Sequence, residues 1–257
     1  MKNLRVYGKP PYLLALLHGG PGARGSLAGA ARELGRFRGV WEPLQTRLSV
    51  PDLLEELHEQ LSGAAQPLTL AGPSWGAWLG LLYAALFPQE VKHLVLISCP
   101  PLEDKFVPQI LQRRLALLPP EEAAQYQHAQ AVLEHRADGN LPHALETLQR
   151  LTQQTDFYCP CEYDDRDLEP DETQYAAVWP QAEQLRASGT LLAYARRVSC
   201  PITVLHGAQD PHPVQGVLEP LQACGQNVQS LVWEKCGHSP FAETYARDKF
   251  YRFLRQA

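Results

Sequence analysis

The sequence lacks the features of membrane-spanning and exported proteins. No apolar run approaches the roughly 20 residues that a membrane-spanning helix needs. The first 17 residues hold Lys2, Arg5 and Lys9 but only short apolar runs, without the small-residue cleavage site of a signal peptide. We therefore expect a cytoplasmic protein with no membrane partner.

An excess of positive charge is also missing. The 23 basic residues are outnumbered by 28 acidic ones, and the formal net charge is −5. Proteins that bind nucleic acid or anionic lipid use a broad positive field, which this composition does not supply. A small molecule or a short peptide therefore fits better as the partner, whereas the composition does not indicate an oligomeric state.

Cysteine pairs at metal-ligand spacing are absent as well. Six cysteines are scattered through the chain, and only Cys159 and Cys161 lie close together. One residue separates these two, and no second pair stands at the spacing of a zinc site. A chain of 257 residues is long enough to bury a core without disulfides. The prediction is free thiols in a reducing compartment and no metal site.

Short apolar runs alternate with helical patterns in most of the chain. Five continuous runs have the length of strands: Tyr12 to Leu17, Leu68 to Ala71, Val91 to Ser98, Ile202 to His206 and Val228 to Trp233. Continuous apolar runs are typical of parallel strands that are covered on both faces. Helices are expected at Pro51 to Leu61, Trp75 to Phe87 and Phe241 to Leu254. This alternation predicts an α/β fold with a mostly parallel sheet between helices.

Residues 100–198 interrupt the alternation. The segment from Pro100 to Val198 has helical patterns but no convincing strand, so we expect a helical insertion over the carboxyl edge of the sheet. No long polar linker divides the chain. The predicted organisation is therefore a core of residues 1–99 and 199–257 with a helical cap of residues 100–198.

A G-x-S-x-G motif stands between a predicted strand and a predicted helix. Gly72 and Gly76 flank Ser74 at the two positions where a tight strand-to-helix turn leaves no room for a side chain. The bare motif is common, but this context is typical of a nucleophilic serine. We predict that Ser74 is a nucleophile, and the alternative is an ordinary glycine-rich turn.

A serine hydroxyl needs a base to take its proton and an acid to orient that base. Asp210 and His238 each come just after a predicted strand, where open parallel sheets build their sites. The chain order Ser, Asp, His is the order expected of α/β-hydrolases. We therefore predict a triad of Ser74, Asp210 and His238. His206 and His212 remain as rival bases, and Glu103 and Asp104 remain as rival acids.

The run His18-Gly19-Gly20-Pro21-Gly22 follows the strand before the first helix, where this kind of site draws one of its two oxyanion-binding amides. Pro21 has no N–H group to donate. Gly20 is therefore the expected donor, and the amide of Trp75, next to the nucleophile, is the second. The alternative is that these glycines only turn the chain.

HGGPG followed by G-x-S-W-G resembles the prolyl iminopeptidases, which are serine aminopeptidases of the α/β-hydrolase fold. The resemblance covers the core, from Tyr12 to Ser98 and from Pro201 to Leu254, and HGGPG is the more specific motif. It implies release of an amino-terminal residue, commonly proline, through a covalent acyl-enzyme and without metal or cofactor. Pro73 departs from the family, which usually has glycine at this position.

Members of that family recognise the free amine of the substrate through carboxylates of the cap. Here the candidates crowd into the segment from Asp156 to Glu172. We expect the substrate to be bound by Gly19 together with Glu162, Asp164 and Asp165 of this segment. The alternative is a solvated acidic loop that does not bind substrate.

Two other functions remain open. A carboxylesterase or another small acyl hydrolase would use the same triad with an unrelated pocket. A protein that keeps the fold only for binding or as a scaffold would need none of these groups, so the presence of Ser74, Asp210, His238 and two amide donors argues against it.

Overall fold

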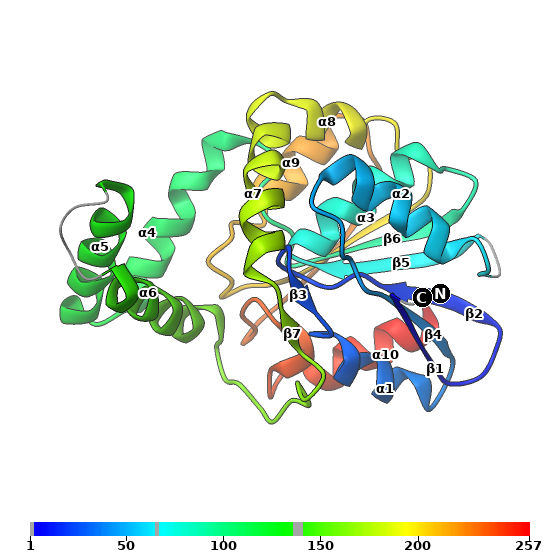
Figure 1. Ribbon diagram of the computed structural model, residues 1–257, viewed down its shortest axis with the longest axis horizontal. Helices are drawn as coiled ribbons and strands as arrows, with labels where there is room; N and C mark the ends of the chain where they lie inside the picture. Colours follow the sequence, from blue (N-terminus) through cyan, green and yellow to red (C-terminus); the bar gives the residue numbers. More distant parts are fainter. Residues whose placement is uncertain (1–2, 65–66, 136–140) are drawn as a thin grey trace.

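A seven-stranded sheet forms the centre of the computed structural model, which describes residues 3–64, 67–135 and 141–257. Its strands are β1 (Leu4–Tyr7), β2 (Tyr12–Leu16), β4 (Gly39–Pro43), β5 (Leu68–Pro73), β6 (Val91–Ile97), β8 (Ile202–Gly207) and β9 (Val228–Trp233). They lie in the order β1-β4-β2-β5-β6-β8-β9 (Figure 1). β1 is antiparallel to β4, and the other neighbouring pairs are parallel. The carboxyl ends of all strands but β1 therefore meet at one edge.

Helices cover both faces of this sheet (Figure 1). One face carries α1 (Ala28–Gly35) and α10 (Arg247–Gln256), and the other carries α2 (Val50–Leu61), α3 (Trp75–Leu86), α8 (Thr190–Ala195) and α9 (Gln215–Ala223). Neighbouring side chains of β2 enter different clusters, since Leu14 and Leu16 pack towards α1 and α10 while Ala15 packs towards α3. Burial on both faces explains why the strands are continuously apolar.

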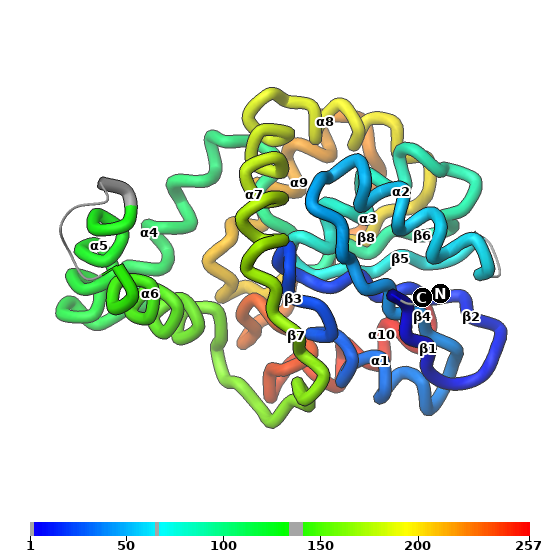
Figure 2. Tube along the Cα trace, in the orientation of Figure 1, coloured from blue at the N-terminus to red at the C-terminus, as the bar shows by residue number. Residues whose placement is uncertain are grey.

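A lobe of three helices stands apart from the sheet (Figures 1 and 2). It consists of α4 (Val107–Leu117), α5 (Pro120–His135) and α6 (Leu141–Asp156), and its own small core includes Leu118, Tyr126 and Leu151. α7 (Glu172–Ala187) is different, because its Val178 and Ala182 belong to the main hydrophobic core beside α3. Two 3₁₀ helices complete the fold: η1 (Asp104–Phe106) and η2 (Pro240–Ala242).

The observed architecture confirms the predicted α/β fold and differs from the expectations in detail. β4 was not expected; it holds a buried glutamate, Glu42, which accepts a hydrogen bond from the Tyr7 hydroxyl at 2.7 Å. Residues 100–198 do contain a strand, the two-residue β7 (Glu169–Pro170), which pairs with β3 (Ala23–Arg24). The expected closing helix is split into η2 and α10. Within the described parts of the chain, no helix is long and apolar enough to cross a membrane.

Candidate active site

Ser74 lies at the turn between β5 and α3 in a strained backbone conformation. Its φ of 53° and ψ of −121° lie outside the regions that a side chain normally allows. The turn is held because the amide of Ser74 donates to the carbonyl of Ile97 at 2.9 Å. Ser74 is thereby placed directly before the first helical residue, Trp75, at the positive end of the α3 dipole.

The two glycines of the motif are required by close backbone approach. A Cβ atom on Gly72 would lie 2.5 Å from the carbonyl carbon and oxygen of Gly76. A Cβ atom on Gly76 would lie 2.2 Å from the carbonyl oxygen of Leu17 and 2.7 Å from that of His18. These contacts involve main-chain atoms beside the sheet, which cannot move aside without disturbing it. The sequence argument for glycine at both positions is therefore met by the structure.

Replacing Gly76 by alanine is expected to destabilise the fold by about 3 kcal/mol or more, because the new methyl group collides with fixed backbone. Gly80, one turn further along α3, is the matched control. There a Cβ atom would come closest to a side-chain methyl of Leu94, at 3.2 Å. The Gly80→Ala variant should unfold within about 1 kcal/mol of the parent in urea, since alanine also favours the helix. Equal stabilities for the two variants would contradict the close approach.

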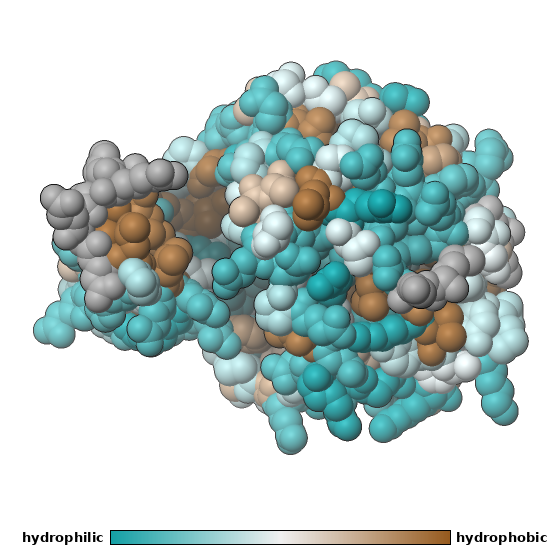
Figure 3. All heavy atoms as spheres, in the orientation of Figure 1, coloured by the Kyte–Doolittle hydropathy of each residue, from teal (hydrophilic) through white to brown (hydrophobic). Residues whose placement is uncertain are grey.

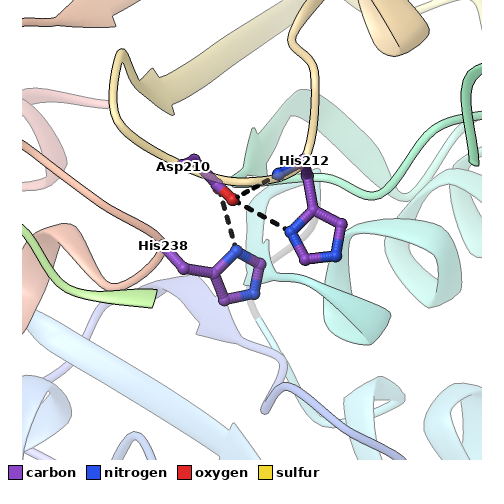
Figure 4. Close-up of side chains that lie close together, drawn as sticks. All are labelled: Asp210, His212 and His238. Carbon is purple, nitrogen blue, oxygen red and sulfur yellow. Dashed lines mark hydrogen bonds and ion pairs between the residues drawn. The ribbon is translucent and has the colours of Figure 1, made fainter. Parts of the chain in front are cut away.

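Asp210 is buried just after β8 and is surrounded by imidazoles (Figure 4). Its Oδ2 atom lies 2.9 Å from Nδ1 of His238 and 3.4 Å from Nε2 of His206. Its Oδ1 atom accepts from both the backbone N–H and Nδ1 of His212, each at 2.9 Å. The rings of His212 and His238 therefore lie beside each other on the same carboxylate, with centroids 4.6 Å apart.

The charges of this cluster follow from burial and proximity. Burial opposes ionisation of Asp210, but the neighbouring imidazoles outweigh it and hold the pKa of the carboxyl well below its usual range. Burial also lowers the pKa of His206 and His212. For His238, the attraction of Asp210 exceeds the effect of burial and raises the pKa. Of the three imidazoles, His238 is thus the one best stabilised as a cation.

The backbone around His238 is hydrogen-bonded to the last residue of α6 and is linked through Glu243 to the residues that follow α6. The amide of His238 donates to the carbonyl of Asp156, the last residue of α6, at 2.6 Å. Glu243 is fully buried and accepts three backbone N–H bonds at 2.8 Å, from Gly237, Tyr158 and Cys159. The Glu243 carboxylate therefore holds both Gly237, the residue before His238, and the first residues after α6.

Arg114 connects this attachment to α4. Its guanidinium lies 2.7 Å from the carboxylate of Asp156 and donates to the hydroxyl of Thr155 at 2.6 Å. The side chain of Arg114 is 7% exposed, so the pair is weakly screened by solvent. The position of the lobe and the position of His238 are thus set by the same contacts.

The glycine-rich run lies against Ser74. A Cβ atom on Gly19 would come within 3.6 Å of the Ser74 Cβ atom, and Gly20 has a φ of 42°, which glycine adopts easily. Burial lowers the pKa of His18 to about 4, and its Nε2 accepts from the amide of Gln45 at 3.3 Å. The Trp75 indole donates to the side-chain oxygen of Gln45 at 2.7 Å. Gln45 therefore joins the two motifs, a role that no local sequence pattern signals.

The acidic segment lies along the arginines of the core. Arg32 of α1 forms ion pairs with both Asp164 and Asp167. The Arg166 side chain, helped by Arg32, lowers the pKa of Asp164 to about 2. Two further pairs join Arg5 to Glu169 and Arg24 to Asp171. Glu162 and Asp165 are exposed, and Asp165 lines a groove of about 700 Å³ together with Tyr163 and Phe241.

The rival acids, Glu103 and Asp104, form ion pairs with basic side chains. Asp104 accepts from the Arg186 guanidinium at 2.5 Å, and Glu103 pairs with Lys105 at 2.8 Å.

The assignment of Ser74, Asp210 and His238 as a triad remains a prediction. The structure places these residues after β5, β8 and β9, at the common carboxyl edge of the sheet. Figure 3 shows the surface hollowed between the lobe and the rest of the molecule.

Comparison with known proteins finds one matching family and several similar solved structures. The sequence profile of the alpha/beta hydrolase fold matches residues 46–245. Among solved structures, the chain resembles VinJ (TM-score 0.70, 20% identity, 98% of this chain and 92% of that one). It also resembles the proline iminopeptidase of Mycobacterium smegmatis (TM-score 0.65, 17% identity, 98% and 92%) and a thermophilic esterase from Thermogutta terrifontis (TM-score 0.59, 17% identity, 98% and 91%). A search of curated proteins finds no match.

Proposed function

The chain belongs to the alpha/beta hydrolase fold family, and from this premise we propose that it is a serine hydrolase that works through an acyl-enzyme on Ser74. The observation that carries the proposal is the strained turn at Ser74, with φ at 53° between two glycines that the backbone requires. Strain of this kind persists only where the surrounding structure holds it, and it is typical of a nucleophile at a strand-to-helix turn.

The proposed reaction begins when Nε2 of His238 takes the proton of the Ser74 hydroxyl. The hydroxyl oxygen then bonds to the substrate carbonyl carbon, and the imidazolium is stabilised by Asp210, 2.9 Å away on the Nδ1 side. The same proton passes to the leaving group as the bond to it breaks. A water molecule, deprotonated by His238, then releases the acyl group and restores the hydroxyl.

The negative charge that develops on the substrate oxygen requires nearby donors. We assign this role to the amides of Gly20 and Trp75. The Trp75 amide is the first of α3, and an α-helix has no carbonyl of its own to bind the amide at this position. The glycine-rich run lies against Ser74 at Gly19. A Cβ atom added to Gly19 would lie only 3.6 Å from the Cβ atom of Ser74.

Within this class we favour an aminopeptidase of prolyl iminopeptidase type. The support is the HGGPG motif beside the nucleophile and the structural likeness to a proline iminopeptidase. Such an enzyme needs a carboxylate for the substrate ammonium group. Glu162, Asp164 and Asp165 are the proposed candidates, and Asp165 lies in the groove next to Phe241, three residues after His238.

An esterase is the second candidate, and one observation favours it. Asp164 is already paired with both Arg32 and Arg166, so its charge is not free for a substrate ammonium group. An acyl hydrolase would not need such a charge. The likeness to an esterase from Thermogutta terrifontis is compatible with this function.

A substrate panel separates the two. Aminoacyl-nitroanilides with a free amine, including proline nitroanilide, are compared with their amine-blocked forms and with nitrophenyl acyl esters. The aminopeptidase is supported if free-amine substrates turn over and blocked ones do not. Turnover of acyl esters alone would leave the esterase. A chain that neither turns over any substrate nor reacts with a fluorophosphonate would be a binding protein.

A further inference from the structure

The proposed reaction leaves two imidazoles of the cluster, those of His206 and His212, without a role. A triad needs a single histidine on its carboxylate, whereas Asp210 here carries His238 on one oxygen and His212 on the other (Figure 4). Figure 4 shows a nitrogen of each ring turned towards the carboxylate. His212 therefore adds a nitrogen donor to the site that hydrolysis does not require.

Two imidazoles and a carboxylate are a ligand set that zinc prefers. One donor atom from each of Asp210, His212 and His238 can be chosen so that all lie within 4.8 Å of one another. Zinc binds nitrogen and oxygen at about 2.0–2.2 Å, so small movements of the two rings would bring these atoms around one ion. Each imidazole side chain is 14% exposed whereas the Asp210 carboxylate is buried, so an ion would have to reach the carboxylate past the two rings.

The surroundings hold the three groups in place. His212 stands between Pro211 and Pro213, which restrict the backbone on both sides. The carbonyl of His212 accepts from Nε2 of His206 at 2.9 Å, and Arg113 donates to the backbone carbonyl of Asp210 at 3.3 Å. Such contacts orient ligands before the ion arrives and raise metal affinity.

We propose that Asp210, His212 and His238 form a zinc-binding site that inhibits the hydrolase. Zinc takes the lone pair of Nδ1 on each ring, and each neutral ring keeps its proton on Nε2. His238 then presents an N–H group, not a lone pair, towards Ser74 and cannot accept the serine proton. The inhibition rests on the proposed function, whereas the binding itself does not.

Binding is measured first, by calorimetry on the Ser74→Ala chain after treatment with a chelator. We expect one zinc ion per chain and no binding of Mg²⁺, which prefers oxygen ligands. The decisive variant is His212→Asn in the same background. Its amide can still donate to Oδ1 of Asp210 from the position of Nδ1, but an amide is a poor zinc ligand. Zinc affinity should fall by at least about tenfold.

The matched control is His128→Gln, which removes an exposed histidine of α5 in the lobe. Its zinc affinity should equal that of the parent. Equal affinities for His212→Asn and the parent would overturn the proposal, as would the absence of zinc binding. Cobalt bound to the unaltered chain gives a test that does not depend on any variant. A thiolate-to-cobalt absorption band would place the ion on cysteine thiols instead and would also overturn it.

Inhibition is measured on the active chain with the best substrate of the panel. We expect zinc to stop turnover reversibly, with recovery after a chelator is added, and the His212→Asn enzyme to need about tenfold more zinc. Zinc that binds through His212 without slowing turnover would refute the inhibitory role. If the chain binds zinc but hydrolyses no substrate, the zinc site is supported and the proposed hydrolase function is rejected. A failure of the zinc site can thus be distinguished from a failure of the proposed function.

Discussion

The Ser74→Ala chain is expected to lose about 10⁴-fold or more in kcat and all labelling by a fluorophosphonate. Alanine removes the only atom that can bond to the substrate carbonyl, while the donors that stabilise the developing charge remain in place. Substrate binding should therefore change much less than turnover. Steady-state kinetics with the best substrate of the panel, together with intact mass after labelling, measure both effects.

Ser98→Ala is the matched control for this substitution. Ser98 follows β6, the strand beside β5, and also has a positive φ, of 43°. Its hydroxyl is buried and makes no hydrogen bond to any of the described residues, so its removal should leave turnover nearly unchanged. Similar activity losses in the two variants would indicate a structural effect and remove the case for Ser74 as the nucleophile.

The Asp210→Asn chain is expected to lose about 10⁴-fold in kcat while remaining folded. The reason lies in the donors from His212, which point two N–H groups at Oδ1 of residue 210. The asparagine oxygen will face these donors, so its NH₂ group must face Nδ1 of His238. That ring then carries its proton on Nε2 and cannot accept one from Ser74.

Asp104→Asn tests the same change at the rival acid. Asp104 pairs with Arg186 at the surface, with a side chain that is 53% exposed, so its loss should alter kcat by less than about twofold. The pH dependence of kcat/KM for both variants shows whether the base is affected. A large loss at Asp104 with a small one at Asp210 would transfer the role of the acid to residue 104.

Much of the fold follows from short-range patterns. Residues 68–86 have a continuous apolar strand, two glycines and an apolar helix in immediate succession, and these few residues require the turn at Ser74. The expected positions of β2, β6, β8 and β9 rest on similar runs. β4 escaped prediction because its polar Glu42 is satisfied by Tyr7 of β1, a partner 35 residues away.

The supporting groups of the candidate site depend on contacts that no local pattern encodes. Gln45 joins His18 to Trp75, and Glu243 binds the amides of Tyr158 and Cys159, which lie more than 80 residues earlier. A glutamine or glutamate in a sequence gives no sign of which distant amide it will meet. Such residues can be found only when the chain is folded.

The amino-acid sequence by itself determined the α/β fold. It also determined that a serine, an aspartate and a histidine each follow the end of a strand, because strand, turn and helix are set by neighbouring residues. The tertiary structure decided which charged side chains are already paired with one another. It places Arg32 against Asp164 and Asp167, and it places three imidazoles around Asp210. Electrostatic attraction depends on distance in space, and that distance is fixed only by the packing of residues far apart in the chain.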